Sequence, residues 1–214
     1  EAQPKDAERW LRIMVVPGFA KRWLMPRIEA MRHLRPGLKF AIEPNSTFTE
    51  VDGKSADLGI VYGLDGEYAD SREALICPRV FPICTPEYLA SIDPIDSPRD
   101  LIKHELIHVD DGEWWNLWFA AHDLDIHLKS DLLYVNNDHA LSVAESGQGI
   151  ALANEVLVRH ELASGKLVRA IDDQVKLESY RVLTPSAELS ADAVWFIQWL
   201  KTELEEDFPQ AVIS

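Results

Sequence analysis

The chain is poor in cysteine and lacks the short motifs of common enzymes. Cys77 and Cys84 are the only two cysteines among 214 residues, and they do not form a C-x-x-C pair. Two isolated thiols favour free cysteines over a disulfide framework. The sequence also lacks a G-x-S-x-G elbow, a P-loop and a dinucleotide fingerprint. We therefore expect no catalysis, no cofactor and no structural cross-link.

Long apolar runs and basic clusters are missing as well. No run of about 18 apolar residues is present, so no transmembrane helix is expected, and the polar start of the chain shows no signal-peptide pattern. The 36 acidic residues outnumber the 21 basic ones and give a net charge of −15. DNA binding needs clustered Lys and Arg. These residues alone should therefore not bind nucleic acid, and we expect a cytoplasmic location.

Short apolar runs alternate with segments of helical periodicity along the whole chain. This alternation predicts an α/β fold with mostly parallel sheets. Strands are predicted at 11–16, 38–43, 57–62, 75–84, 105–109, 131–135, 150–153 and 178–184. Helices are predicted at 19–34, 86–91, 98–103, 113–122, 138–147, 154–163 and 190–206. Two extended, proline-containing segments, 81–86 and 182–185, could each carry the chain between two lobes, which predicts a hinge and a ligand between them.

The run Pro17–Arg27 follows the first predicted strand and reads as a tight turn and the start of a helix. The start of a helix presents free backbone N–H groups and the positive end of the helix dipole. Such a turn is suited to bind an anionic or polar ligand. The sequence P-G-F-A-K-R-W-L-M-P-R at these positions is the most informative motif of the chain.

Further motifs follow in a fixed order. They are A-D-L-G-I-V-Y-G at 56–63, V-F-P-I-C-T-P-E-Y-L at 80–89, H-E-L-I-H at 104–108 with W-N-L-W at 115–118, A-E-S-G-Q-G-I-A-L at 144–152, L-A-S-G-K-L-V at 162–168 and Y-R-V-L-T-P at 180–185. Together with the 17–27 run, they resemble the effector-binding domain of LysR-type transcriptional regulators, most of all the subgroup with the glycine-cleavage activator and the β-lactamase regulator. The chain departs from the family pattern P-S/T-F-A-x-R-W-L-x-P-R at one position, because Gly18 replaces a hydroxyl residue.

The resemblance implies a type II periplasmic-binding-protein fold of two α/β lobes joined by two crossover strands. Lobe I would comprise residues 10–82 and 186–214, and lobe II residues 83–185. Residues 1–9 would end a linker from a missing N-terminal winged helix-turn-helix, which with its linker occupies roughly 90 residues. It further implies a small-molecule effector in the cleft, a homodimer or tetramer, DNA contact only through the missing domain, and no membrane contact.

The resemblance also implies a set of ligand-binding residues at helix starts and strand ends. They are Pro17, Gly18, Phe19, Thr47, Phe48, Tyr62, Thr85, Asn137, Asp138, His139 and Tyr180. A hydroxyl at position 18 would cap the helix and bind a carboxylate, so Gly18 predicts a bulkier or less anionic effector. Asp138 would suit an amine or amino acid. For several of these residues a structural role is an alternative: Gly18 as a turn residue, Thr85 and Asn137 as helix caps, and both tyrosines as packing groups.

Two other hypotheses compete with the regulator. One is an extracytoplasmic solute-binding protein of the same fold whose signal peptide has been removed. The other is a metal site at His104 and His108, which are four residues apart. The predicted strand at 105–109 separates the two imidazoles, and no third ligand has a fitting spacing, so we expect no metal. The cluster of Trp114, Trp115 and Trp118 is expected to pack in the core.

Overall fold

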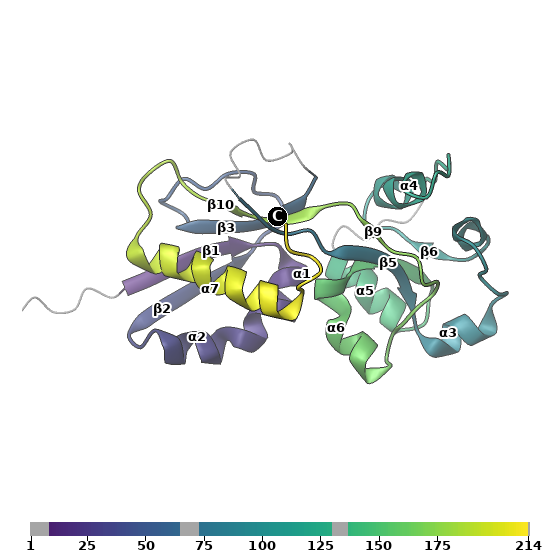
Figure 1. The fold of residues 1–214 in the computed structure, drawn as a ribbon, viewed down its shortest axis with the longest axis horizontal. Helices are drawn as coiled ribbons and strands as arrows, with labels where there is room; N and C mark the ends of the chain where they lie inside the picture. The colour runs from purple at the N-terminus through teal and green to yellow at the C-terminus, as the bar shows by residue number, and fades with distance from the viewer. Residues whose placement is uncertain (1–8, 65–72, 130–136, 214) are drawn as a thin grey trace, which may run out of the picture. The chain divides into compact units, whose positions relative to one another are not determined.

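A computed structural model of the chain describes residues 9–64, 73–129 and 137–213. The described residues divide into two compact units (Figure 1). The first unit combines Glu1–Cys77 with Glu178–Ser214, and the second consists of Pro78–Leu177. The second unit is therefore inserted into the sequence of the first.

The first unit contains a five-stranded sheet in the order β2-β1-β3-β10-β4. Its strands are β1 (Arg9–Val15), β2 (Leu38–Pro44), β3 (Leu58–Gly63), β4 (Glu73–Ile76) and β10 (Ser179–Leu183). β1 pairs in parallel with β2 and β3, whereas β10 is antiparallel to β3 and β4. The parallel strands therefore end at the edge of the sheet where β10 begins.

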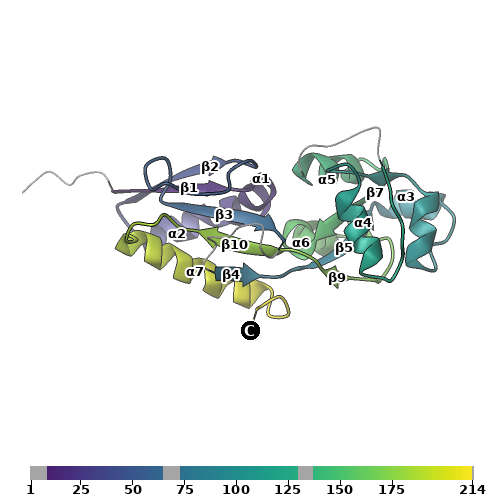
Figure 2. The ribbon, with the colours of Figure 1, turned by 90° about the horizontal axis from the view of Figure 1, so that it is seen from above.

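Helices cover one face of this sheet and a loop covers the other (Figure 2). A continuous helical run comprises α1 (Pro17–Phe19), a π-helical turn (Ala20–Leu24), a 3-10 turn (Met25–Arg27) and α2 (Ile28–Leu34). It packs against α7 (Ala191–Asp207), where Trp23 Nε1 donates a 3.0 Å hydrogen bond to Asp207. On the opposite face, Val51 and Ala56 of the loop after β2 pack on Met14, Val61 and Leu183.

The second unit contains a sheet in the order β6-β7-β5-β8, to which β9 adds by pairing with β5. Its strands are β5 (Arg79–Cys84), β6 (Leu106–Ile107), β7 (Ile150–Asn154), β8 (Val168–Arg169) and β9 (Val175–Lys176). Its helices are α3 (Pro86–Ser91), a 3-10 helix (Pro98–Lys103), α4 (Glu113–Ala120), α5 (Asn137–Glu145) and α6 (Glu155–Ser164). Trp115, Trp118 and Phe119 on α4 are at most 1% exposed, so the tryptophan-rich segment is core.

Three sequence-based expectations differ from the structure. The predicted strand 75–84 is two strands, because the chain leaves the first sheet at Ile76 and enters the second at Arg79. The sheets are mixed rather than mostly parallel, because β5 and β10, the strands that follow each passage between units, run antiparallel to their neighbours. β8 and β9 were not predicted, since two-residue strands carry no periodic signal.

The predicted strand at 131–135 lies outside the described residues. The two units join at Cys77–Pro78 and Leu177–Glu178. These points lie five and eight residues before the borders between lobes that the sequence predicts, after residues 82 and 185. Both cysteines are free, and burial raises the pKa of the Cys84 thiol to about 11. Among the described helices, none has the length and apolar content needed to cross a bilayer.

Candidate functional site

Seven of the predicted site residues lie at one edge of the first sheet. Pro17–Phe19 follow the end of β1, Thr47 and Phe48 follow β2, Tyr62 is near the end of β3, and Tyr180 is the second residue of β10. The ends are held together by backbone hydrogen bonds from Val16 N to Ile60 O and from Asn45 N to Val15 O, at 3.0 and 2.9 Å. In open α/β sheets, ligands bind at the carboxyl ends of the parallel strands.

The helical run begins at this edge without a side-chain cap. Its N-cap is Val16, Pro17 occupies the first turn, and Gly18 is buried. The expectation that a hydroxyl at position 18 would cap the helix is corrected by this geometry, because residue 18 lies inside the first turn. Gly18 and Phe19 belong to the turn whose backbone N–H groups have no helical acceptor. A polar ligand at this turn would meet backbone donors.

Three of the predicted aromatic residues of this edge form a row of tilted rings. The ring of Phe19 lies 4.8 Å from that of Tyr180, which lies 4.6 Å from that of Tyr62. Phe19 and Tyr180 are 0% and 1% exposed, whereas Tyr62 is partly exposed. The structural alternative therefore fits Tyr180 well. Phe19 and Tyr180 are buried and support the edge from inside the unit. Tyr62 is the member of this row that is partly exposed.

Thr47 and Phe48 belong to a braced loop. The side chain of Asn45 accepts hydrogen bonds from Thr47 N and Thr47 Oγ1, at 2.8 and 3.0 Å. The Asn45 side chain thereby makes an Asx turn that holds Thr47, a role missed in the sequence although Asn is a preferred residue for such turns. Thr47 is exposed, and Phe48 is half-buried against the cluster formed by Val51 and the sheet.

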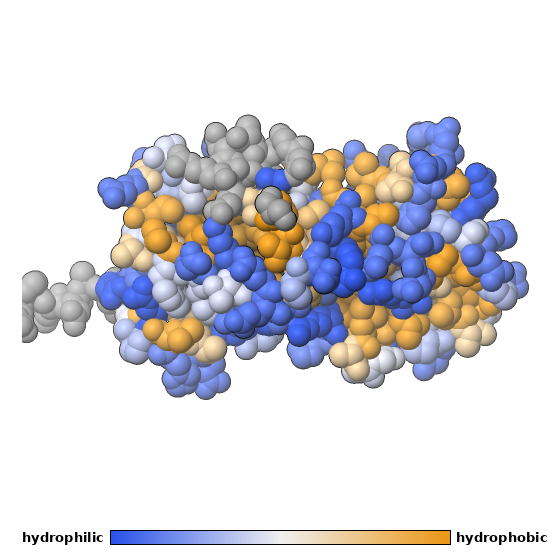
Figure 3. All heavy atoms as spheres, in the orientation of Figure 1, coloured by the Kyte–Doolittle hydropathy of each residue, from blue (hydrophilic) through white to orange (hydrophobic). Residues whose placement is uncertain are grey.

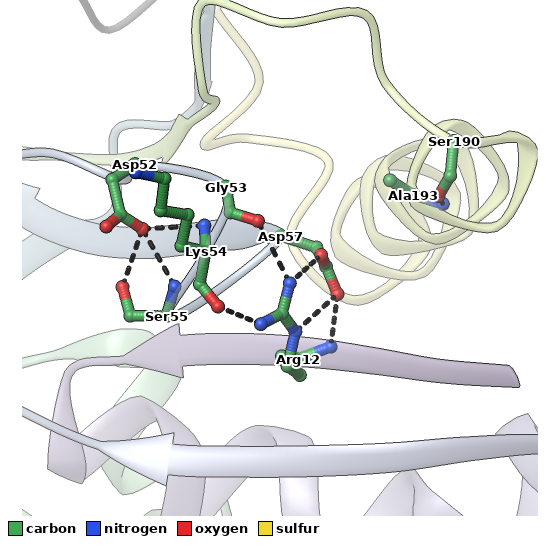
Figure 4. A network of polar contacts seen from close by, with 8 residues as sticks. All are labelled: Arg12, Asp52, Gly53, Lys54, Ser55, Asp57, Ser190 and Ala193. Atoms are coloured by element: carbon green, nitrogen blue, oxygen red, sulfur yellow. Dashed lines mark hydrogen bonds and ion pairs between the residues drawn. The ribbon is translucent and has the colours of Figure 1, made fainter. Parts of the chain in front are cut away.

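Arg12 on β1 clamps the far end of the same loop (Figure 4). Its Nη2 donates to Asp57 Oδ1 at 2.7 Å and to Gly53 O at 3.0 Å, and its Nη1 donates to Lys54 O. The Arg12 backbone N–H adds a 2.8 Å bond to Asp57 Oδ2. Partial burial would raise the pKa of Asp57, but the hydrogen bonds and charge of Arg12 outweigh it and lower that pKa below its ordinary value.

Asp52 closes a tight turn between the clamp and the rest of the loop. Its Oδ1 accepts hydrogen bonds from Ser55 N, Ser55 Oγ and Lys54 N, each at 2.8 Å. These bonds, led by the one from the Ser55 backbone, lower the pKa of Asp52 to about 2. The segment 45–57 is therefore fixed at its start, its turn and its end, although it contains no regular secondary structure.

In the second unit, the predicted residues of α5 lie at the corresponding edge of its sheet. α5 packs on β7 and is joined to it by a short turn, so it begins where β6 and β7 end. Asn137 is its first residue, Asp138 is half-buried and His139 is exposed. At the same edge Asn154 caps α6, and Arg79 Nη2 pairs with Glu155 at 2.6 Å.

Thr85 lies at the opposite edge of the second sheet. It follows the end of β5, is 8% exposed, and its Oγ1 accepts a 3.2 Å hydrogen bond from Tyr88 N at the start of α3. A Cβ on Gly147, just beyond the end of α5, would lie 3.5 Å from that hydroxyl. The nine residues of α5 span about 13 Å. The structure therefore does not bring Thr85 together with Asp138 and His139, and its placement fits the alternative role as a helix cap.

Among the described residues of the second unit, the histidines form no recognisable metal centre. His108 follows β6 and is 7% exposed, and burial lowers its pKa against the raising effect of Asp110, Glu105 and Asp111. A neutral imidazole is thus favoured at this position. Within the ranges that the structure describes, no three His, Cys, Asp or Glu side chains are grouped as a metal site would require.

A groove of about 920 Å³ lies on the first unit beside α2 and the edge strand β2. Trp10 and Met25, which line it, are 49% and 48% exposed. Basic side chains also line it, namely Arg32, Arg35 and Lys39. In the view of Figure 3, apolar side chains over α2 lie beside hydrophilic ones. An exposed apolar patch with a polar rim is typical of an interaction surface.

Two α/β units, joined by two chain connections and carrying polar groups at the carboxyl ends of their strands, define a ligand-binding domain of the periplasmic-binding-protein type. The chain belongs to the LysR substrate binding domain family, whose sequence profile matches residues 5–205. The resemblance found in the sequence motifs is confirmed.

Related proteins are transcriptional regulators. The chain is 30% identical over 203 residues to the glycine cleavage system transcriptional activator of Escherichia coli, covering 92% of this chain and 66% of the relative. The effector domain of AmpR from Pseudomonas aeruginosa has a TM-score of 0.78 at 24% identity, covering 94% of this chain and 97% of that one. The regulatory domain of CrgA from Neisseria meningitidis has a TM-score of 0.76 at 19% identity, covering 92% and 100%. The chain thus spans about two thirds of its curated relatives.

Proposed function

We propose that the chain is the effector-binding part of a longer LysR-type transcriptional regulator of the cytoplasm, without catalytic activity. Effector binding would change how an N-terminal DNA-binding module contacts its operator, within a dimer or tetramer. Membership of the family and the gathering of seven predicted residues at one sheet edge carry this proposal. The named relatives are regulators, so the solute-binding alternative is not favoured.

The proposed effector contacts are assigned unit by unit. In the first unit they are the first helical turn at Pro17–Phe19, the loop residues Thr47 and Phe48, and Tyr62, with Tyr180 supporting them from below. In the second unit they are Asn137, Asp138 and His139 at the start of α5. Thr85 is retained only as a cap. Because Asp138 is an acid and position 18 offers no hydroxyl, the proposed effector class is an amine or an amino acid.

A titration tests this class directly. The chain would be mixed with each of the twenty proteinogenic amino acids and with simple primary amines while its thermal unfolding is followed. A ligand at 100 times its Kd stabilises the folded state by about 2.7 kcal/mol, which is readily detected. Asp138→Asn should reduce the response to amines. The matched control is Glu87→Gln, in the first turn of α3. If no compound in the panel raises the melting temperature, the proposed effector class is wrong.

DNA binding is tested with the complete regulator. The chain alone, with a net charge of −15, should not be retained by duplex DNA at any salt concentration. A regulator that includes the upstream residues should bind with an affinity that falls steeply as salt rises. Retention of the isolated chain by DNA would overturn the proposal that only the N-terminal module contacts DNA.

The proposed oligomer uses the groove beside α2 and β2. β2 is an edge strand, and the edge of a sheet has backbone groups that can pair with another chain. Trp10 and Met25 line the same groove and are exposed. Arg32, Arg35 and Lys39 make this surface basic on a strongly acidic chain, which favours a second acidic copy as the partner. Sedimentation velocity at increasing salt should show dissociation if charge complementarity contributes.

A further inference from the structure

Gly59 is unusual in the first sheet because its surroundings, and not its backbone, require glycine. It lies inside β3, where glycine packs nothing and weakens a strand. A Cβ at this position would lie 2.5 Å from Phe48 Cε2, 2.9 Å from Val51 Cγ2 and 3.3 Å from Leu183 Cβ. The first two distances are shorter than real Cβ contacts, so any residue other than glycine would push the side chains of Phe48 and Val51 away from β3.

The side chain missing at Gly59 is replaced by the ring of Phe48. Gly59 pairs with Met14 on β1 and with Leu183 on β10, and the side chains of both belong to the cluster on which Phe48 packs. The ring therefore sits directly on the backbone of the central strand.

We propose that Gly59 is a positioning residue of the effector site, which it acts on by setting how close Thr47 and Phe48 lie to the sheet. The inference rests on the proposed function, since it assigns the role of a residue that does not itself touch the effector. Asn45 bonds Thr47 at one end of the loop, and Arg12 holds residues 53–57 at the other. Between these two anchors, the contact of Phe48 with Gly59 sets the depth of the loop.

This arrangement also has a consequence for specificity. With alanine at position 59 the ring would be lifted from the strand, and Thr47, one residue away, would move with it. Gly59 is thus expected to leave more room above the loop than alanine would, and so to admit a larger effector.

The first test uses the ligand-free chain and its backbone amides. Hydrogen exchange followed by NMR would compare Gly59→Ala with wild type at Asn45 and Thr47, whose amides are hydrogen-bonded in the structure. We expect about tenfold faster exchange at these two amides. Asp57, whose amide bonds Arg12 O, should change much less because the clamp is intact. Unchanged exchange at Asn45 and Thr47 would overturn the proposal.

Two further variants separate positioning from general destabilisation. Phe48→Val removes the ring atom that a Cβ on residue 59 would approach most closely, so Gly59→Ala should have a much smaller additional effect in that background, where only the close approach to Val51 Cγ2 remains. Val182→Ala leaves a cavity on the opposite face of the neighbouring strand β10, where Val182 is 3% exposed. It should lower stability without selectively accelerating exchange at Thr47. Equal acceleration in Val182→Ala would show that Gly59 acts only through stability.

The second test measures the effector response with the panel of amino acids and primary amines. For any compound that stabilises wild type, Gly59→Ala should weaken binding about tenfold or more and Val182→Ala should not. A loop that loosens while affinity stays the same would remove the positioning role and leave the proposed function standing. If wild type responds to no compound in the panel, the proposed effector class fails, and the exchange result still decides whether Gly59 sets the loop.

Discussion

The two units differ in how well they bring the predicted site residues together at one edge of a sheet. In the first unit, three parallel strands and β10 bring segments from residues 17, 47, 62 and 180 to one edge. In the second unit, the predicted residues lie at two opposite edges of the sheet. Asp138 and His139 are at the start of α5, whereas Thr85 follows the carboxyl end of β5 and lies beyond the end of α5. A position near the start of a helix is therefore weak evidence that a residue belongs to the site. The direction of the preceding strand decides which edge a residue reaches.

The largest expected loss of stability comes from substitutions of buried aromatic side chains, one in each unit. Phe19→Ala in the first unit and Trp118→Ala in the second should each reduce the free energy of unfolding by about 3–5 kcal/mol. Both side chains are fully buried, but Phe19 also supports Tyr180 and Tyr62. Urea denaturation would measure the loss. An unchanged effector response in Phe19→Ala would contradict the supporting role of this row of aromatic rings.

The Arg12 clamp gives the next effect and a pH dependence. The pKa of Asp57 is lowered in the folded chain, so its ion pair stabilises the fold above the unfolded pKa of about 3.9 and is lost as the pH falls through the lower folded value. Asp57→Asn should reduce stability by about 1–2 kcal/mol at neutral pH, since the pair is partly exposed.

Chemical denaturation between pH 6 and about pH 3 would check this. Wild type should lose stability more steeply than Asp57→Asn as the solution becomes acidic. The clamp belongs to the first unit, so Asp172→Asn, in an exposed ion pair of the second unit, is a suitable control. Parallel curves for wild type and Asp57→Asn would show that the clamp contributes nothing.

Thr85→Val sharpens the contrast between the two edges of the second unit. Removal of the cap should lower stability by about 1 kcal/mol. The response to an effector that binds at the start of α5 should stay the same, because Thr85 lies beyond the other end of that helix. A calorimetric titration would check both quantities. Loss of effector binding with an unchanged melting temperature would return Thr85 to the site.

The smallest effect on stability is expected at the groove. Trp10→Glu changes a half-exposed side chain, so the free energy of unfolding of the monomer should change by less than about 1 kcal/mol. Its effect should appear in assembly, as a shift toward monomers in sedimentation velocity. Val194→Glu, at a 53% exposed position of α7, is the matched control. If both variants assemble like wild type, the interface is elsewhere.

Much of the fold could be predicted from periodicity and motifs. The helix at 86–91 and the strand starting at 38 agree with α3 and β2 because each has strong local signals, such as Thr85 before Pro86 and a run of apolar residues. The break at Cys77–Pro78 was missed although Pro78 and Arg79 interrupt the apolar run 75–84, because the assignment of its two halves to different sheets depends on the tertiary arrangement. The same limit applies to β10, whose antiparallel direction depends on the path between units.

The candidate site was predicted less completely, for a physical reason. Motifs indicated strand ends and helix starts, and the first unit brings those together. They did not indicate Asn45, Arg12 or Gly59, whose roles depend on contacts between segments of the chain. Arg12 and Asp57 are 45 positions apart, and Gly59 matters only because Phe48 occupies the space beside it. Contacts of this kind have no local sequence pattern.

The insertion of the second unit into the first has a consequence for how the chain is made. Residues 78–177 are continuous in sequence, so we expect this unit to fold once they have left the ribosome. The first sheet has to wait, because β10 joins β3 and β4 and is synthesised after the whole second unit. Until then, β3 has an open edge. We expect nascent chains that stop before residue 178 to contain a folded second unit beside an incomplete first one, and to engage chaperones there.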